Sequence, residues 1–314
     1  MTRSSQGTPN VIKRYNDFNS YLRRTYGCRV QKITVDAGFT CPNRDGRLST
    51  RGCIYCNPRG SGTGAYRRGL SVTDQLLAGK KSLYKRYKAK KFIAYFQAFT
   101  NTYAPLPRLR EVYDEALAVD DIAGLAIGTR PDCVDADILD LLTGYAADGH
   151  LVWVEYGLQS ADDATLALIN RGHDFNCFQE AVRETKKRGL NVCAHIILGL
   201  PGEQRRHMIR TAELLADMAI DGVKIHLLYV IKGTALATMY QQHRFQCLEQ
   251  EEFAALVCDV LEHLPKSTII QRLTGDPHPQ ELVAPQWALR KQETLGLIHT
   301  ILETRDSYQG KRVF

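Results

Sequence analysis

Long apolar runs are missing from this sequence. No run approaches the roughly 18 residues that a transmembrane helix needs, and the start of the chain is polar, without the apolar segment of a secretory signal. We therefore expect a cytoplasmic protein with no membrane partner. The nine cysteines are an odd number, and in a reducing compartment they indicate thiols or metal ligands rather than a disulfide framework.

Two sequence features that would indicate a different fold or a second domain are also absent. No Gly-x-Gly-x-x-Gly opens a helix after the first apolar segment, which disfavours a dinucleotide-binding fold. No Pro/Ser-rich linker interrupts the chain, which favours one large domain over two small ones. The sequence does contain 44% hydrophobic and 24% charged residues among 314, which suffices for a sizeable buried core.

Apolar segments alternate with amphipathic ones, a pattern typical of repeated βα units in an α/β fold. Strands are expected at 30–35, 92–97, 122–129, 151–157, 191–199, 223–230 and 268–273. Helices are expected at 71–90, 106–119, 135–148, 175–188, 204–219 and 249–263, with a final helix at 285–308 over an edge or end of the barrel. Such repeats form a doubly wound sheet or a full or partial barrel. We favour one barrel-like domain with additions at both ends.

Positive charge is concentrated in the N-terminal part of the chain. Residues 1–91 contain 20 Lys and Arg against four Asp and Glu, a formal charge of +16, whereas 92–314 contain 21 against 30, a charge of −9. The densest part, 80–91, carries seven of these cations, with Tyr84 and Tyr87 between them. Such a segment can follow a phosphate backbone, and it can equally be the solvated face of a helix.

Three cysteines lie in one predicted loop after the first strand. Eleven residues separate Cys41 from Cys53, and two separate Cys53 from Cys56; loops at this end of barrel strands carry active sites. Structural zinc needs a fourth ligand, for which His150 is the nearest histidine in the sequence. Three thiolates on a four-iron cluster instead leave one iron open. The spacing alone leaves both metals possible.

The cysteine loop resembles the cluster loop of the radical S-adenosylmethionine (SAM) superfamily, in which an aromatic residue, here Tyr55, precedes the last cysteine. Its long first spacing is similar to that of the branch related to the elongator catalytic subunit, most closely the YhcC/YtqA-type proteins. Further landmarks of that branch follow in order: 38–46 (GFTCPNRDG), 129–132 (TRPD), 155–160 (EYGLQS), 169–173 (INRGH) and 195–203 (HIILGLPGE).

This resemblance implies a fold and a division of the chain. The fold is a partial (β/α)6 TIM-like barrel of radical SAM type, with an N-terminal extension and a C-terminal helical addition. The expected parts are a tail and extension at 1–29, the core barrel at 30–275 with the cluster loop at 41–56, and a helical extension at 276–314.

The resemblance also implies the cofactors and the residues that bind them. A [4Fe-4S] cluster would be held by Cys41, Cys53 and Cys56, with SAM on its open iron. Contacts with SAM are expected from Tyr55, Gln97, Gln159, Ser160, Ile197 and Leu228. The sequence departs from the superfamily at 96–101 (FQAFTN), where a Gly-Gly-Glu usually contacts the SAM amino group; backbone carbonyls of this segment can take its part.

Alternation along the strands predicts polar side chains inside the barrel. The inward positions include Glu155, His195, Lys224, His226 and Arg272. Charged groups in apolar strands are costly to bury without a purpose, so we expect Glu155, His195 and Arg272 to be catalytic in a polar lumen. The alternative is a structural ion pair of Glu155 with Lys224 or Arg272.

The activity implied by the resemblance is cleavage of SAM to methionine and a 5′-deoxyadenosyl radical, which takes a hydrogen atom from the substrate. Elongator relatives act on the wobble uridine of tRNA, and YhcC/YtqA-type proteins resemble enzymes that convert its carboxymethylaminomethyl group toward aminomethyl. The basic N-terminal part, with Arg44, Arg47 and Arg51 in the cluster loop, fits a tRNA partner. An electron donor such as flavodoxin or ferredoxin is also implied. Because the chain ends at Phe314, acetyl transfer is not expected.

Two other functions agree with the sequence. One is a radical SAM enzyme that acts on a protein or small metabolite, its basic surface serving an acidic reductant. The other is a non-catalytic, zinc-containing RNA-binding protein. The cysteines outside the loop are expected to be small buried hydrophobes, with a thiol role conceivable for the first two: Cys28, Cys133, Cys177, Cys193, Cys247 and Cys258.

Overall fold

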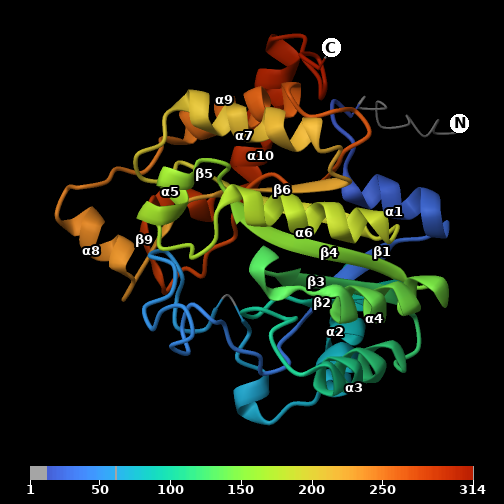
Figure 1. Cartoon of the computed structure of the whole chain (residues 1–314). Helices are drawn as coiled ribbons and strands as arrows, with labels where there is room; N and C mark the ends of the chain where they lie inside the picture. The colour runs from blue at the N-terminus through green and yellow to red at the C-terminus, as the bar shows by residue number, and fades with distance from the viewer. Residues whose placement is uncertain (1–12, 61, 314) are drawn as a thin grey trace, which may run out of the picture.

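A curved parallel sheet forms the centre of the protein (Figure 1). The computed structural model describes residues 13–60 and 62–313, so the polar start expected to be frayed lies outside the described residues. Seven strands pair in parallel in the order β1-β2-β3-β4-β5-β6-β8. They are β1 (Val30–Val35), β2 (Lys91–Phe96), β3 (Ile122–Thr129), β4 (Leu151–Gln159), β5 (Asn191–Leu198), β6 (Gly222–Leu227) and β8 (Ile269–Arg272). The α/β partial-barrel prediction is confirmed.

Helices cover the outer face of the sheet (Figure 1). They are α2 (Val72–Tyr87), α3 (Leu106–Leu117), α4 (Ala136–Ala147), α6 (Phe175–Lys187), α7 (Arg205–Asp217) and α9 (Gln250–Glu262). The strands β2 to β6 are buried on both faces, which is why they read as nearly continuous apolar runs, whereas the edge strands β1 and β8 are only partly buried. Capping fixes helix starts: Ser71 and Asp74 form a capping box at α2, and Asp135 accepts from the Ile138 N–H at α4.

A helix that the sequence did not predict closes the amino-terminal end of the barrel. It is α1 (Phe18–Tyr26), whose Phe18 and Tyr21 rings contact buried Trp153 edge-on at 5.9 and 6.1 Å between centroids. Just before it, the Asn16 carbonyl accepts from the Ile270 N–H at 2.8 Å, so this segment covers the free edge of β8. The lumen therefore opens at the carboxyl ends of the strands.

Two predicted elements differ from the structure near the end of the sheet. The strand expected at 223–230 breaks after Leu227, and its last part forms β7 (Val230–Ile231), which pairs antiparallel with β9 (Leu282–Ala284). The outer neighbour β8 pairs only with Gly222–Lys224, so beyond Lys224 the strand is held on one side only, by β5, and this pairing ends at Leu227. The released segment instead contributes Leu228 to a cavity at the mouth.

The final helix begins later than predicted. A 3-10 turn, η3 (Gln286–Leu289), precedes α10 (Lys291–Thr304), because Pro285 fixes an extended start and Arg290 is not helical. Leu289 is consequently 42% exposed instead of lying on the buried face. The helix packs mainly on α9 and not on the sheet edge, and the Cys258 thiol donates to the Ile298 carbonyl between them.

The remaining short elements surround the mouth. They are η1 (Tyr66–Arg68), η2 (Pro131–Cys133), α5 (Asp163–Leu168) and α8 (Ala235–Gln241). The sequence did not predict α5 or α8, since neither is long enough to show a helical repeat. None of the described helices is long and apolar enough to cross a membrane.

Candidate functional site: a cysteine loop over a polar lumen

The predicted site residues meet where the strands end. A cavity of about 180 Å³ is lined by all three loop cysteines and by Tyr55, Gln97, Glu155, Gln159, His195 and Arg272. A neighbouring cavity of about 620 Å³ is lined by Ile197 and Leu228 and shares several of these side chains. Strand alternation and the position of the loop had singled out residues that are far apart in the sequence, and in the structure these residues lie around the same cavities.

Ser160 is the predicted contact that lines neither cavity. Its hydroxyl donates to Glu203 Oε1 and accepts from the Asp162 N–H at 3.0 Å. Burial raises the pKa of Glu203 to about 7, despite the Ser160 hydrogen bond. We therefore assign Ser160 to holding the turn after β4, next to Gln159, which does reach the cavity.

The cysteine loop is fixed by side chains from another part of the chain. Asn43 donates to the Asn170 carbonyl at 2.6 Å, and Asn170 donates back to the Gly52 carbonyl at 2.7 Å. Within the loop, Arg44 donates to the Cys56 and Asn57 carbonyls at 2.7 and 2.8 Å. These contacts give Asn43, Arg44 and Asn170 a structural role in holding the cysteine loop. Because Arg44 is engaged by backbone carbonyls, it is not available to bind a nucleic acid.

Basic groups surround one thiol. The Cys53 sulfur accepts from Asn43 Nδ2 at 3.6 Å and from Arg171 at 3.7 Å. Burial would raise the pKa of Cys53, but the Arg171 guanidinium outweighs it and holds that pKa below its ordinary value. Burial raises the pKa of Cys56. A thiolate with N–H donors is the ligand that iron–sulfur clusters use.

The three loop thiols are free and face one cavity, so this donor set fits a [4Fe-4S] cluster. Between residues 13 and 313, position 61 apart, no three His, Cys, Asp or Glu side chains are already close enough to hold a single metal ion. His150 directly precedes β4, at the opposite end of the barrel from the loop, and so cannot be the fourth ligand of a structural zinc.

A glycine permits the close approach of Arg171 to the end of β4. A Cβ at Gly157 would lie 2.6 Å from the Arg171 guanidinium and 2.7 Å from Gln159 Nε2. The register of β4 against β5 shifts between Gly157 and Gln159, and Gln159 takes a positive φ of 79°. This bulge turns Gln159 toward the cavity, as bulges beside active sites often do.

A buried carboxylate organises the floor of the cavity. Glu155 is fully buried and accepts from Lys32, Lys224 and His195, the last at 2.9 Å. Burial would raise the pKa of Glu155, but the two ammonium groups outweigh it and hold that pKa well below its ordinary value. The expected pair with Lys224 is present, whereas an ion pair of Arg272 with any described carboxylate is not.

Sequence reasoning missed two members of this network. Lys32 binds Glu155 and Gln271, the latter at 2.6 Å, and Tyr95 lies with its ring 4.0 Å from the Lys224 ammonium. Both lie on inward-facing positions, so the alternation that found Glu155 would also have found them. Burial lowers the pKa of Lys32 to about 8.

Two histidines of the lumen are neutral. The His195 and His226 rings lie 5.3 Å apart, and His226 Nε2 is buried without a partner among the described residues. Burial lowers the pKa of His195 to about 4 and that of His226 well below its ordinary value. With Arg272 charged beside them, the open part of the lumen carries positive charge and suits an anionic group.

We expect these histidines to make the protein less stable in mild acid. Because burial depresses the pKa of His195 to about 4, the unfolded chain binds a proton between about pH 6.5 and 4 that the folded chain does not, so stability falls as the pH falls through that window. The depressed pKa of His226 acts in the same direction. Each contributes up to about 1.4 kcal/mol per pH unit. Urea unfolding at pH 7 and pH 5 measures the slope. His195→Phe should make it shallower, and an unchanged slope would contradict this account.

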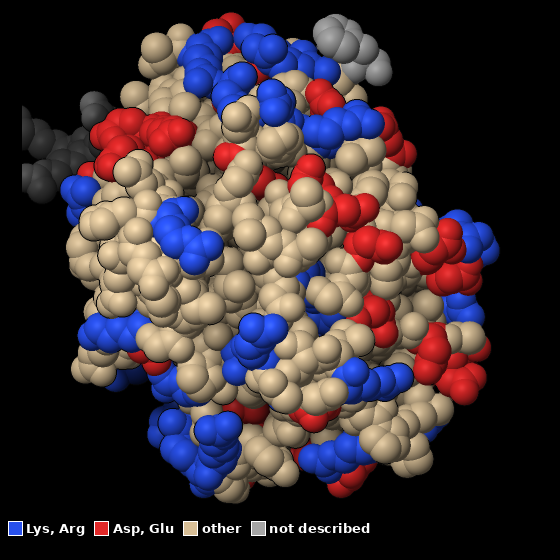
Figure 2. Space-filling view, turned by 60° about the vertical axis from the view of Figure 1, so that its left-hand side comes forward, with Lys and Arg blue, Asp and Glu red and all other residues tan. Residues whose placement is uncertain are grey.

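The basic residues of the first third divide into two groups. Arg47, Arg51, Arg67 and Arg68 are exposed around the cysteine loop and η1, and Figure 2 shows Lys and Arg predominating in the lower part of that face. A second group, which we call the far basic group, lies near the end of α2 and the starts of β1 and β2. It comprises Arg29, Lys81, Lys85, Arg86, Lys88, Lys90 and Lys91.

The far basic group lies at the opposite end of the barrel from the cysteines. β1 alone separates the two ends by about 20 Å. None of the group forms an ion pair with a described carboxylate, and two of its guanidinium groups, those of Arg29 and Arg86, lie 4.9 Å from the ring of Tyr87. The group therefore cannot touch a substrate at the cluster, but it can hold a long polyanion that also reaches the mouth.

Of the cysteines outside the loop, only Cys193 and Cys258 are fully buried. The prediction of small buried hydrophobes is wrong for the others, which are partly exposed: Cys28, Cys133, Cys177 and Cys247. Burial nevertheless raises the pKa of Cys133 to about 12 and that of Cys177 to about 11, so both are protonated at neutral pH.

Comparison with known proteins defines the class. Residues 45–215 match the Radical SAM superfamily, and residues 220–304 match the Radical_SAM C-terminal domain. The chain therefore belongs to the radical SAM superfamily, and it is a radical SAM enzyme whose cofactors are a [4Fe-4S] cluster and SAM and which needs a reductant. Within it, the chain is of the YhcC/YtqA type: it is 45% identical over 302 residues to YtqA of Bacillus subtilis (strain 168), which covers 96% of this chain and 94% of YtqA.

More distant relatives extend the comparison. A tRNA uridine(34) acetyltransferase of Dehalococcoides mccartyi (strain CBDB1) is 28% identical over 172 residues, 52% of this chain and 36% of that protein. The solved structure of Methanocaldococcus infernus Elp3 with an N-terminal deletion matches with a TM-score of 0.68 at 19% identity, over 89% of this chain and 64% of that one. This second likeness confirms the fold.

Proposed function

We propose that this enzyme modifies the side chain of the wobble uridine of tRNA in the cytoplasm, converting carboxymethylaminomethyl toward aminomethyl. The carboxymethyl carbons would leave as glyoxylate, and SAM, which is reductively cleaved, would take up the two electrons that this oxidation releases. The observation that carries the proposal is positive charge at both ends of the barrel that forms no ion pair with a described carboxylate, which fits a polyanion long enough to reach both ends. Sequence similarity to a tRNA uridine(34) acetyltransferase over half of the chain supports the same substrate class.

The lining of the two cavities supports the proposed cofactor contacts. Cys41, Cys53 and Cys56 would hold the cluster, and Tyr55, Gln97, Gln159, Ile197 and Leu228 would surround SAM. When bound, the two cofactors supply an electron and a 5′-deoxyadenosyl radical that takes a hydrogen atom from the substrate. The chain's own part is to bind both ligands in the right orientation and to exclude water.

The lumen residues suit a carboxylate-bearing substrate. Arg272 lines both cavities and is not engaged by a described carboxylate, so its guanidinium is available to an anionic side chain. Glu155 holds His195 in place through Nε2, and neutral His195 faces the cavity as a proton acceptor or donor. An electron donor such as flavodoxin or ferredoxin would approach the exposed side of the cysteine loop.

The direct test is mass spectrometry of tRNA nucleosides from a deletion strain of the source organism. We expect carboxymethylaminomethyl-uridine to accumulate and aminomethyl-uridine to disappear. Wild-type chain should restore the profile and Cys53→Ala should not. An unchanged profile in the deletion strain would overturn the proposal and leave a protein or small-metabolite substrate.

The far basic group gives a second, independent test of tRNA binding. We expect Lys81→Gln, Lys85→Gln and Lys88→Gln together to weaken binding of transcript tRNA about tenfold and to reduce the slope of log K against log salt by about 2 to 3. A matched control removes Arg183, Lys187 and Arg210, which are exposed but paired with glutamates. Equal effects of the two triple variants would count against a specific tRNA surface.

A further inference from the structure

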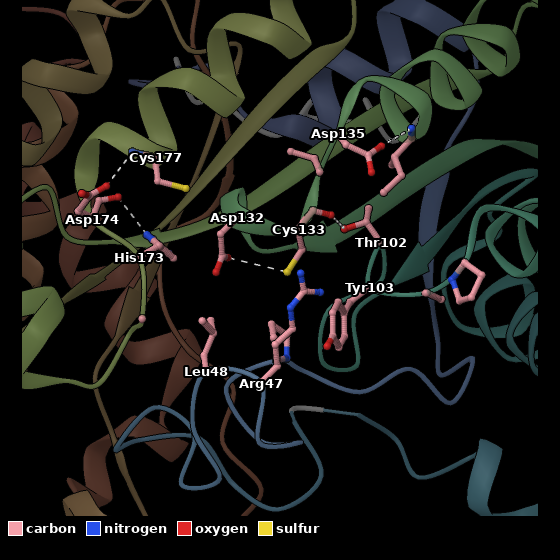
Figure 3. Close-up of a pocket in the computed structure, with 16 residues that line it drawn as sticks. Arg47, Leu48, Thr102, Tyr103, Asp132, Cys133, Asp135, His173, Asp174 and Cys177 are labelled. Carbon is pink, nitrogen blue, oxygen red and sulfur yellow. Dashed lines mark hydrogen bonds between the residues drawn. The ribbon is translucent and has the colours of Figure 1, made fainter.

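A cavity of about 890 Å³ lies outside the lumen, on the other side of the cysteine loop (Figure 3). We call it the outer cavity. It is formed by the cysteine loop and by the segments that follow β2, β3 and β4. Its volume is in the range of small-molecule pockets, and nothing in the cofactor chemistry uses it.

The outer cavity is one layer of side chains away from the lumen. Arg130 lines the lumen cavity, and it is held by two 2.8 Å hydrogen bonds to the carboxylate of Asp132, which lines the outer cavity. In the same way Arg171 contacts Cys53, while the next residue, Gly172, lines the outer cavity. An occupant of the outer cavity therefore lies beside whatever occupies the lumen.

The two sides of the outer cavity differ in chemistry. Figure 3 shows Leu48, Arg47 and Tyr103 on one side, with Asp132 and Cys133 facing them. The Arg47 guanidinium lies 5.7 Å from the centre of the Tyr103 ring, and Leu48 is 50% exposed. One side is thus a flat apolar and aromatic surface with a cation at its rim.

The facing side carries fixed negative charge. Besides Asp132, it includes Asp135 and Asp174, which cap α4 and α6 by accepting backbone N–H groups at 2.9 and 2.8 Å. Asp132 is paired with Arg130, whereas Asp135 and Asp174 form no ion pair with a described cation, so these two disfavour a phosphate inside the cavity. The carboxylate oxygens can accept further N–H groups. The occupant that fits is an aromatic ring with a donor edge whose phosphate stays outside, at Arg47.

We propose that the outer cavity binds the base of a nucleotide next to the uridine being modified. The base stacks on Tyr103, presents N–H groups to Asp132, and leaves its phosphate at Arg47. Proteins commonly read single-stranded RNA loops by splaying neighbouring bases into separate sites and stacking them on aromatic side chains. This inference rests on the proposed function, because it takes the substrate to be RNA.

Binding of an anticodon stem–loop RNA to the anaerobic holoenzyme tests the proposal. Three RNAs are needed: the intact one, and two that lack the base on one or the other side of the target uridine. Tyr103→Ala should weaken binding of the intact RNA about tenfold, within the range seen when one stacked base is lost. One of the two abasic RNAs should bind the wild-type protein about tenfold more weakly than the intact RNA does. Tyr103→Ala should not weaken the binding of that abasic RNA any further.

Two further variants keep the result interpretable. Leu48→Asp changes a half-exposed side chain at the same surface, and it should weaken binding of the intact RNA in the same way as Tyr103→Ala does. Tyr308→Ala removes a tyrosine that is 42% exposed near the carboxyl terminus, outside both the outer cavity and the far basic group, and should weaken binding no more than about twofold.

The outcomes separate this inference from the proposed function. If wild type binds and modifies the RNA while Tyr103→Ala and Leu48→Asp bind it normally, the inference is overturned and the function stands. A loss in Tyr103→Ala that is equally large on both abasic RNAs would also overturn it. If wild type neither binds the RNA nor alters tRNA nucleosides, both fall together.

Discussion

Cys41→Ala, Cys53→Ala and Cys56→Ala are each expected to lose the iron–sulfur cluster and SAM cleavage together. The three thiols are the cysteines that line the lumen cavity, and a four-iron cluster with two remaining thiolate ligands is held too weakly to survive purification. Iron analysis of anaerobically reconstituted protein should fall from about four per chain to near zero, with loss of the brown charge-transfer absorption. Cleavage of SAM should fall to the background of the reductant alone.

Cys133→Ala is the matched control for the loop cysteines. Its sulfur lies in the outer cavity next to the loop, but it does not line the cluster cavity. We expect full iron content and normal SAM cleavage. Full iron content in any of the three loop variants would show that the remaining side chains complete the site, and it would remove the basis for the cluster assignment.

The cysteine loop shows what the sequence can and cannot reveal. Spacing singled out the three cysteines as candidate ligands, and the family resemblance, not the spacing, favoured an iron–sulfur cluster over zinc. The supports were not identifiable, because Asn170 and Arg171 are more than a hundred positions from the cysteines they hold. Their pairing with the loop depends on β1 and β4 ending at the same side of the sheet, which is a property of the fold and not of any local pattern.

The barrel itself was largely predictable, since long apolar strands and periodic helices give strong signals. The elements that were missed are short or depend on tertiary contacts. α1 is an example: its Phe18, Tyr21 and Leu22 are apolar because they close the barrel floor against Trp153. Nothing in the first thirty residues indicates that a floor is needed. The late start of α10 likewise depends on local backbone at Pro285 and Arg290.

Glu155→Gln is expected to reduce the free energy of unfolding by about 3 to 5 kcal/mol, the usual effect of removing one partner from a buried ion pair. The amide would leave Lys32 and Lys224, whose side chains are 16% and 4% exposed, without a counter-charge. This is a large share of the roughly 5 to 15 kcal/mol that stabilises a typical domain. Urea unfolding at pH 7 measures it. Above about pH 8 the loss should shrink, because Lys32 then gives up its proton.

Asp259→Asn is the matched control for this loss. Asp259 is also buried and binds two cations, Arg205 and Arg305, each at 2.9 Å. Those guanidinium groups are 61% and 37% exposed, so water can replace the carboxylate, and the expected loss is about 1 kcal/mol or less. A loss for Glu155→Gln as small as this would show that the lumen ammonium groups do not depend on Glu155.

A triple variant separates the structural role of Glu155 from its role in the reaction. Glu155→Leu with Lys32→Met and Lys224→Met replaces the whole ion cluster with apolar groups, a change that is often neutral or stabilising. We expect it to recover most of the stability that Glu155→Gln loses but to lack the proposed tRNA modification, because His195 then has no carboxylate to hold its ring. If the triple variant modified tRNA normally, Glu155 would be a purely structural counter-ion, and His195 and Arg272 alone would remain as candidates for the chemistry.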